Sequence, residues 1–182
     1  MKVLGLVGLP ASGKGECSQI AVELGIPVVV MGDVIRRYAE NEGLDATDTH
    51  LGEIARRLRE EHGMAAIAEL TVPEVQALSA PVVLIDGIRG DAEVDLYRNT
   101  FDDFTVIAID SPFHLRLRRV GARGRSDDMQ TAIDLRSRDE RECGFGLAEA
   151  MKKADITIIN TSSLASFRDE VRRILKTTGG IP

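Results

Sequence analysis

Residues 8–16 read Gly-Leu-Pro-Ala-Ser-Gly-Lys-Gly-Glu and lie between an apolar run, Val3–Val7, and a helical pattern from Lys14 to about Leu24. The first seven of these residues fit the pattern G-x-x-x-x-G-K, which binds phosphate where it joins a strand to a helix. Its glycines let the loop turn several backbone N–H groups inward at a helix N-terminus, where they form an anion-sized cradle. The stretch therefore predicts a buried strand, a phosphate loop and a helix, which together begin an α/β fold.

The rest of the chain alternates short apolar runs with amphipathic helical stretches, a pattern typical of a parallel sheet with helices on both faces. The predicted strands are residues 3–7, 27–31, 82–86, 105–110 and 155–159. The predicted helices are residues 14–24, 34–78 with breaks near Gly43 and Gly63, 91–99, 113–121, 129–143, 147–153 and 164–177. We therefore expect a three-layer, doubly wound α/β fold around a five-stranded parallel sheet.

Two long helical segments interrupt this alternation. We expect a single domain over residues 1–182, with a core made of residues 1–33, 80–112 and 154–182. Residues 34–79 form a helical insertion, and residues 113–153 form a short Arg-rich lid and the helices after it. Ligands bind at the carboxyl ends of strands in doubly wound folds, so both segments are candidates for binding a substrate and closing over it. The alternative is that they are helical padding.

Composition excludes several classes of protein. The net charge of −6, the 4% of aromatic residues and the lack of Trp argue against a nucleic-acid-binding surface. No apolar run approaches the roughly 20 residues of a membrane span, and the N-terminus does not read as a signal peptide, so we expect no membrane partner and a cytoplasmic protein. Cys17 and Cys143 have no metal-binding spacing, and two free thiols are favoured over one long-range disulfide.

The phosphate loop ends in Lys14-Gly15, and it resembles the loop of adenylate kinases and related nucleoside monophosphate kinases. The resemblance implies that ATP is the donor and that Lys14 stabilises charge on the β- and γ-phosphates during transfer. The implied nucleotide-binding residues are Gly8, Leu9, Pro10, Ala11, Ser12, Gly13, Lys14, Gly15 and Glu16. These kinases have Thr where this chain has Glu16. Its carboxylate either helps to hold Mg²⁺, perhaps through water, or faces away on the helix.

Two further strand ends carry matching segments. Met31-Gly-Asp33-Val-Ile-Arg36 resembles the Thr-Gly-Asp-x-Leu-Arg segment of adenylate kinases, which implies that Arg36 binds the acceptor phosphate and that Asp33 acts near the metal or its waters. Asp86-Gly-Ile-Arg89 resembles their Asp-Gly-Phe-Pro-Arg segment, which implies a metal-side carboxylate at Asp86 and a substrate-phosphate ligand at Arg89. Asp33 is also a candidate helix cap, and Asp86 a candidate turn residue.

Arginines crowd the segment after the fourth predicted strand. Arg125-Ser-Asp-Asp resembles the Arg-x-Asp-Asp segment after the adenylate kinase lid, and Arg136 follows eleven residues later, as a second phosphate-binding Arg does in that family. Arg123, Arg125 and Arg136 are therefore the candidates for neutralising the transferring group and excluding water. The alternative is a solvated basic face.

The last predicted strand ends at Asn160, which the resemblance places beside the adenine ring, although Asn160 and Thr161 are equally suited to capping the terminal helix. The resemblance covers nearly the whole chain and is strongest to small archaeal P-loop proteins related to adenylate kinase or dephospho-CoA kinase. It implies the strand order 2-3-1-4-5 and an ATP- and Mg²⁺-dependent kinase with a small, nucleotide-like acceptor. The alternatives are transfer to a hydroxyl, as in dephospho-CoA kinase, and a nucleotide-dependent regulatory ATPase.

Overall fold

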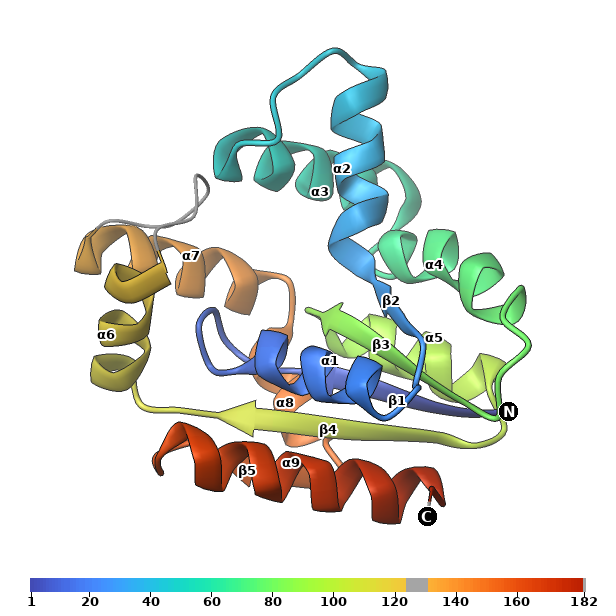
Figure 1. Ribbon diagram of the computed structural model, residues 1–182. Coiled ribbons are helices and arrows are strands. Elements are labelled where there is room, and N and C mark those ends of the chain that lie inside the picture. The colour runs from blue at the N-terminus through green and yellow to red at the C-terminus, as the bar shows by residue number, and fades with distance from the viewer. Residues whose placement is uncertain (124–130, 182) are drawn as a thin grey trace.

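The computed structural model describes residues 1–123 and 131–181, and within them five parallel strands form one sheet (Figure 1). The strands are β1 (Lys2–Val7), β2 (Val28–Val30), β3 (Val82–Ile88), β4 (Phe104–Asp110) and β5 (Ile156–Ile159). They lie in the order β2-β3-β1-β4-β5. The predicted doubly wound fold and its strand order are confirmed.

The described helices follow the predicted pattern. They are α1 (Lys14–Glu23), α2 (Met31–Asn41), α3 (Asp48–His62), α4 (Ala66–Gln76), α5 (Asp91–Thr100), α6 (Phe113–Arg123), α7 (Ala132–Gly144), α8 (Leu147–Lys152) and α9 (Leu164–Gly179). The long helical segment is broken near Gly43 and Gly63, as predicted. Met31 was expected to end the second strand but opens α2, because Val30 is the last extended residue before the chain turns helical.

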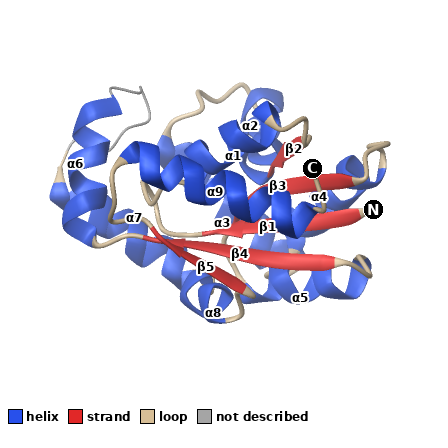
Figure 2. Cartoon of the chain, turned by 60° about the horizontal axis from the view of Figure 1, so that its bottom comes forward, coloured by secondary structure: helices blue, strands red, loops and turns tan. Residues whose placement is uncertain are grey.

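The sheet has an apolar layer on each face because successive strand residues point to opposite sides. Val3 and Val7 of β1 enter the core under α2, α4, α5 and α8, whereas Leu4 and Leu6 enter the core under α1 and α9. The same alternation holds along β3 and β4. Figure 2 shows the resulting helix–sheet–helix sandwich.

The carboxyl ends of the strands lie along one edge of the sheet, which we call the carboxyl edge. In Figure 1 the arrowheads of β3 and β4 point towards α6 and α7, and α2 and α3 rise over the same side. Helices from three separate parts of the chain therefore surround the loop between β1 and α1.

Neither cysteine is paired. Cys17 is buried in the core under α1, and Cys143 is exposed near the end of α7. Burial raises the pKa of the Cys17 thiol to about 12, which keeps it protonated and unreactive. The prediction of two free thiols is confirmed.

Across the described ranges, no helix is both long enough and apolar enough to cross a membrane.

Candidate active site

The loop from Gly8 to Gly13 has a backbone that only glycine fits at its two ends. Gly8 and Gly13 have φ angles of 154° and 123°. A Cβ atom on Gly8 would lie 2.6 Å from the carbonyl oxygen of Ile109, and one on Gly13 would lie 2.5 Å from Nδ2 of Asn160. Close packing and positive φ angles together therefore require glycine at both positions. Helix α1 begins directly after the loop.

Lys14 folds back over this loop. Its ammonium group donates hydrogen bonds to the carbonyl oxygens of Gly8 and Leu9, the latter at 3.1 Å. Burial lowers the pKa of Lys14, while the carboxylates of Glu142 and Asp86 act in the opposite direction. The ammonium group of Lys14 is thus held against the phosphate loop, at the carboxyl edge of the sheet.

The loop has the donors and the space that a phosphate group needs. The hydroxyl of Ser12 is buried, and no hydrogen-bond partner for it exists among the described residues. An unpaired buried hydroxyl costs about 1–3 kcal/mol, a cost that an incoming anion would remove. At Gly15 an added Cβ atom would meet nothing within 4 Å. The residues of the loop therefore fit a nucleotide phosphate.

Arg116 fastens the loop to the lid segment. Its guanidinium, 3% exposed as a residue, donates to the carbonyl oxygens of Ser111 at 3.1 Å and Pro10 at 3.2 Å. It also forms a two-point ion pair with Asp139 of α7, at 2.8 and 2.7 Å. One side chain thus joins the phosphate loop, the end of β4 and α7.

Arg119 and Asn160 complete this support. Arg119 donates to the carbonyl oxygen of Ser12 at 3.2 Å and to the side-chain oxygen of Asn160 at 3.0 Å. The amide group of Asn160 donates to the same Ser12 carbonyl at 2.7 Å. The side chain of Asn160 therefore supports the loop, and Ser163 is the residue that caps α9.

A hollow of about 540 Å³ opens beside this support, within the size range of ligand pockets. Its lining residues are Gly13, Glu16, Leu115, Arg118, Arg119, Asn160, Thr161, Ser162, Leu164 and Phe167. We call it the donor hollow. Asn160 and Thr161, which the resemblance placed beside the adenine ring, both line it.

Glu16 lies on the donor-hollow side of α1. Its carboxylate accepts a hydrogen bond from Arg168 of α9 at 2.6 Å. Ser18 is two residues further on, about 200° around the helix, and its hydroxyl donates to Asp86 at 2.7 Å. Whether Glu16 helps to hold Mg²⁺ stays a prediction. The carboxylate of Asp86 interacts with the charge of Lys14.

A second, narrow hollow of about 40 Å³, which we call the acceptor hollow, is lined by Arg89 and Arg138, whose charges act on Lys14. Its lining residues are Gly32, Ile35, Arg36, Asp48, Leu51, Gly52, Arg89, Arg138 and Arg141. The two predicted substrate-phosphate ligands, Arg36 and Arg89, are thus brought together there, although they come from different strand ends. Asp33 lies beside them, because Arg36 donates a hydrogen bond to its carboxylate.

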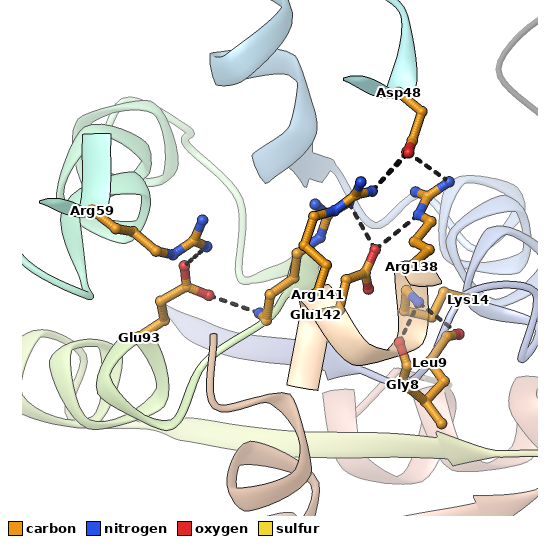
Figure 3. A network of polar contacts seen from close by, with 10 residues as sticks. Gly8, Leu9, Lys14, Asp48, Arg59, Glu93, Arg138, Arg141 and Glu142 are labelled. Atoms are coloured by element: carbon orange, nitrogen blue, oxygen red, sulfur yellow. Dashed lines mark hydrogen bonds and ion pairs between the residues drawn. The ribbon is translucent and has the colours of Figure 1, made fainter. Parts of the chain in front are cut away.

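Glu142 lies between this hollow and Lys14. Arg138 donates to it at 3.0 Å, and Arg89 lies 3.7 Å from it. Burial alone raises the pKa of Glu142, but Arg89, Arg138 and Lys14 outweigh burial and lower the pKa to about 2. Figure 3 shows this charge network, with Asp48 above Arg138 and Arg141 and with Lys14 below, over Gly8 and Leu9.

A buried ion pair supports the backbone of Arg89. Glu93 accepts hydrogen bonds from the backbone N–H groups of Arg89 at 2.7 Å and Gly90 at 3.2 Å. Its other oxygen accepts one from Arg59 at 2.7 Å, and the Arg59 guanidinium stacks 4.2 Å from the ring centre of Phe145. The helical insertion therefore helps to position a residue of the acceptor hollow.

Of the predicted lid arginines, only Arg136 has a side chain among the described residues, so their joint action stays a prediction. Arg136 is exposed, and its guanidinium lies over the ring of Phe113 at 4.7 Å. Arg123 is the last residue of α6, but its side chain lies outside the described residues, as does all of Arg125.

Sequence reasoning missed four residues around the acceptor hollow, namely Asp48, Arg138, Arg141 and Glu142. A signal was present for three of them, because Arg138, Arg141 and Glu142 are spaced i, i+3 and i+4 and so share one face of a helix. It also missed the loop supports Arg116 and Arg119, which no local pattern separates from the neighbouring arginines.

Comparisons with known proteins agree with this fold. A family model described as an AAA domain matches residues 7–136. A "UPF0200 protein" from Methanoculleus marisnigri is 55% identical over 180 residues, covering 99% of this chain and 98% of the relative. Among solved structures, a dephospho-CoA kinase from Campylobacter jejuni superposes with a TM-score of 0.62 at 21% identity, covering 99% of both chains. A shikimate kinase from Bacteroides thetaiotaomicron superposes with a TM-score of 0.61 at 15% identity, covering 97% of both.

Proposed function

The chain belongs to the AAA domain family and to the archaeal UPF0200 proteins, and from this premise we propose that it is an ATP- and Mg²⁺-dependent phosphotransferase with a small, nucleotide-like acceptor. One observation carries the proposal. Lys14 directly follows Gly13, which lines the donor hollow, and its charge interacts with Arg89 and Arg138, two of the four arginines that line the acceptor hollow. A transferase needs two such sites on either side of the transferred group.

The donor hollow and the phosphate loop would hold ATP. The loop would supply backbone N–H groups at the N-terminus of α1 and the unpaired hydroxyl of Ser12, and Lys14 would supply a positive charge for the β- and γ-phosphates. Arg116, Arg119 and Asn160 keep the loop from rearranging as charge moves, because they bind its carbonyl oxygens. Pre-organised charge of this kind is the main source of catalysis in phosphoryl transfer.

Asp86 is the residue that would hold Mg²⁺, with Ser18 fixing its carboxylate. Magnesium is usually bound through one or two carboxylates, water and the nucleotide phosphates. A single carboxylate near the end of β3 is consistent with that coordination. When bound, the ion would neutralise phosphate charge.

The acceptor hollow would hold the second substrate. Arg36 and Arg89 are suited to a phosphate because a guanidinium binds two oxygens at once. An oxygen of the acceptor would form a bond to the γ-phosphorus as the bond from that phosphorus to the β–γ bridging oxygen breaks, and ADP would leave. A phosphate acceptor needs no base, because its oxygen is already anionic.

Transfer to a hydroxyl, as in dephospho-CoA kinase, is the second candidate. Asp33 favours it, since its carboxylate is about half exposed and pairs with Arg36, which lines the acceptor hollow, so that it could accept a proton. The two structural neighbours, titled dephospho-CoA kinase and shikimate kinase, are consistent with a hydroxyl acceptor.

The test is an acceptor panel. The protein is incubated with Mg²⁺-ATP and AMP, other nucleoside monophosphates, dephospho-CoA or shikimate, and ADP release and product mass are recorded. Phosphorylated AMP would support the first candidate, and phosphorylated dephospho-CoA the second. Slow hydrolysis without an acceptor would indicate a nucleotide-dependent regulatory ATPase instead. Lys14→Ala should lower the rate roughly 10²–10³-fold, as loss of one charge-stabilising donor does, and an unchanged rate would contradict all three functions.

A further inference from the structure

The acceptor hollow already contains an anion of the protein itself. Asp48, the first residue of α3, accepts hydrogen bonds from Arg141 at 2.9 and 2.8 Å and lies 3.4 Å from Arg138. Figure 3 shows the Asp48 carboxylate facing both guanidinium groups. It is the one acidic residue in the lining of a hollow that four arginines share.

The contact joins two parts of the chain that are far apart in sequence. Asp48 belongs to the helical insertion and Arg141 to α7. Arg141 also packs flat against the insertion, since a Cβ atom added to Gly52 would lie 3.2 Å from one of its guanidinium nitrogens. All three side chains remain partly exposed, with Asp48 at 34%, Arg138 at 21% and Arg141 at 30%. A contact of this kind can open without exposing apolar core.

The space left in the acceptor hollow is too small for a substrate. About 40 Å³ accommodates a few water molecules, whereas sites for small ligands hold roughly 300–1,000 Å³. A wider hollow of about 400 Å³ adjoins it, sharing Gly52 and Arg141 as lining residues. Separation of Asp48 from Arg141 would therefore release the guanidinium of Arg141 and the side of Arg138 that faces Asp48, while Arg138 stays paired with Glu142, and would join the two spaces.

We propose that Asp48 occupies the binding position of an anionic group on the acceptor, and that the acceptor displaces it from Arg138 and Arg141. The inference rests on the proposed function, and it narrows the acceptor to molecules that carry a phosphate or a carboxylate. A carboxylate and a phosphate present the same paired oxygens to a guanidinium, so the exchange preserves the hydrogen bonds. Asp48 then lowers the apparent affinity for the acceptor by the fraction of time that it occupies the arginines.

The experiment measures binding without transfer. Inorganic phosphate and, separately, gluconate are titrated into the ¹⁵N-labelled protein, and the Nε–Hε signals of its arginines are followed by NMR. Asp48→Asn removes the competing charge but keeps a polar residue at the start of α3, and it should bind the preferred anion about tenfold more tightly than the wild type. Signals of Arg138 and Arg141 should move in both proteins, and Arg141→Ala should abolish the gain. Phosphate or gluconate, whichever binds more tightly, identifies the acceptor's anionic group.

Glu60→Gln is the matched control. It removes one negative charge from the same helix about 18 Å from Asp48, and Glu60 pairs only loosely with exposed Arg56 at 3.9 Å. It should leave the affinity at the wild-type value. The proposal is overturned if Asp48→Asn binds neither anion more tightly than Glu60→Gln does, or if only the Lys14 region responds. Failure of the proposed function is a separate result, because it would appear as a lack of transfer on the acceptor panel with the binding gain intact.

Discussion

The arginines on the two sides of Lys14 differ in what they bind. On the donor side, Arg116 and Arg119 donate to main-chain carbonyl oxygens, including those of the phosphate loop, and Arg116 also pairs with the largely buried carboxylate of Asp139. On the acceptor side, the partners are carboxylates. They are Asp33 for Arg36, Glu142 for Arg89, Glu142 and Asp48 for Arg138, and Asp48 for Arg141.

This difference separates support from binding. A backbone carbonyl cannot leave its place without unfolding the loop, so an arginine that binds it is a permanent part of the structure. A carboxylate at the end of a helix can be replaced by the anion of a ligand, because both offer the same acceptor oxygens. The partner of an arginine, more than its position near the site, indicates whether it is available to a substrate.

Loss of a donor-side arginine should have the largest effect on stability. Arg116→Ala should lower the free energy of unfolding by about 3–5 kcal/mol, because it leaves Asp139 and two carbonyl oxygens without their buried donor. Urea unfolding followed by circular dichroism measures the change.

Arg136→Ala is the control for that variant, since Arg136 also contacts the ring of Phe113 but is exposed. Arg136→Ala should lower the free energy of unfolding by no more than about 1 kcal/mol, which is the usual contribution of an exposed cation–π contact. Equal losses in the two variants would show that the buried hydrogen bonds of Arg116 add nothing to stability.

Glu142 connects the two sides and should control stability in acid. Its pKa falls from 4.5 to about 2 on folding, a difference of roughly 3 kcal/mol. The folded-state pKa is lowered, so this contribution is present above pH 4.5 and is lost as the pH falls through about 2. Glu142→Gln should therefore flatten the dependence of unfolding free energy on pH between 5 and 2, as measured by urea unfolding at each pH.

Glu149→Gln supplies the comparison for this titration. Glu149 is an exposed carboxylate on α8 that pairs with Lys152. Its removal should therefore leave the dependence of unfolding free energy on pH unchanged. The contrary result is an unfolding free energy of Glu142→Gln that falls between pH 5 and 2 as steeply as that of the wild type. That result would mean that Arg89, Arg138 and Lys14 do not keep the Glu142 carboxylate ionised.

The fold and the phosphate loop could be predicted because their signals are local. The glycines of the phosphate loop and the alternation of apolar residues in β1 each specify their structure within a few neighbouring residues. Arg36 and Arg89 were predicted from short segments that resemble those of adenylate kinases, and Arg89 directly follows β3 whereas Arg36 lies within α2.

The pairing on the acceptor side could not be predicted, because it depends on contacts between distant segments. Asp48 and Arg141 are 93 residues apart, and no local pattern states that their helices meet. Arg136 was chosen by its spacing from Arg125, yet α7 turns Arg138 and Arg141 towards the hollow and Arg136 towards Phe113.

Loss of an acceptor-side arginine should have the smallest effect on stability while still weakening ligand binding. Arg36 is about half exposed in its ion pair with Asp33, so Arg36→Ala should change the free energy of unfolding by less than about 1 kcal/mol. Phosphate affinity should fall about tenfold, because a charge-assisted hydrogen bond to a ligand contributes about 1.5–3 kcal/mol and part of that is recovered by water.

Its neighbour Arg37 provides the matched variant, since it is also half exposed and pairs with one carboxylate, Glu74, but does not line the acceptor hollow. Arg37→Ala should therefore be as stable as Arg36→Ala and bind phosphate like the wild type, as measured by thermal unfolding and by titration. If both variants lost affinity equally, the positive charge of α2 would act at long range, and the arginines of the acceptor hollow would differ from those of the donor side only in exposure. If Arg36→Ala alone loses affinity at unchanged stability, binding and support are separate properties of the two sides.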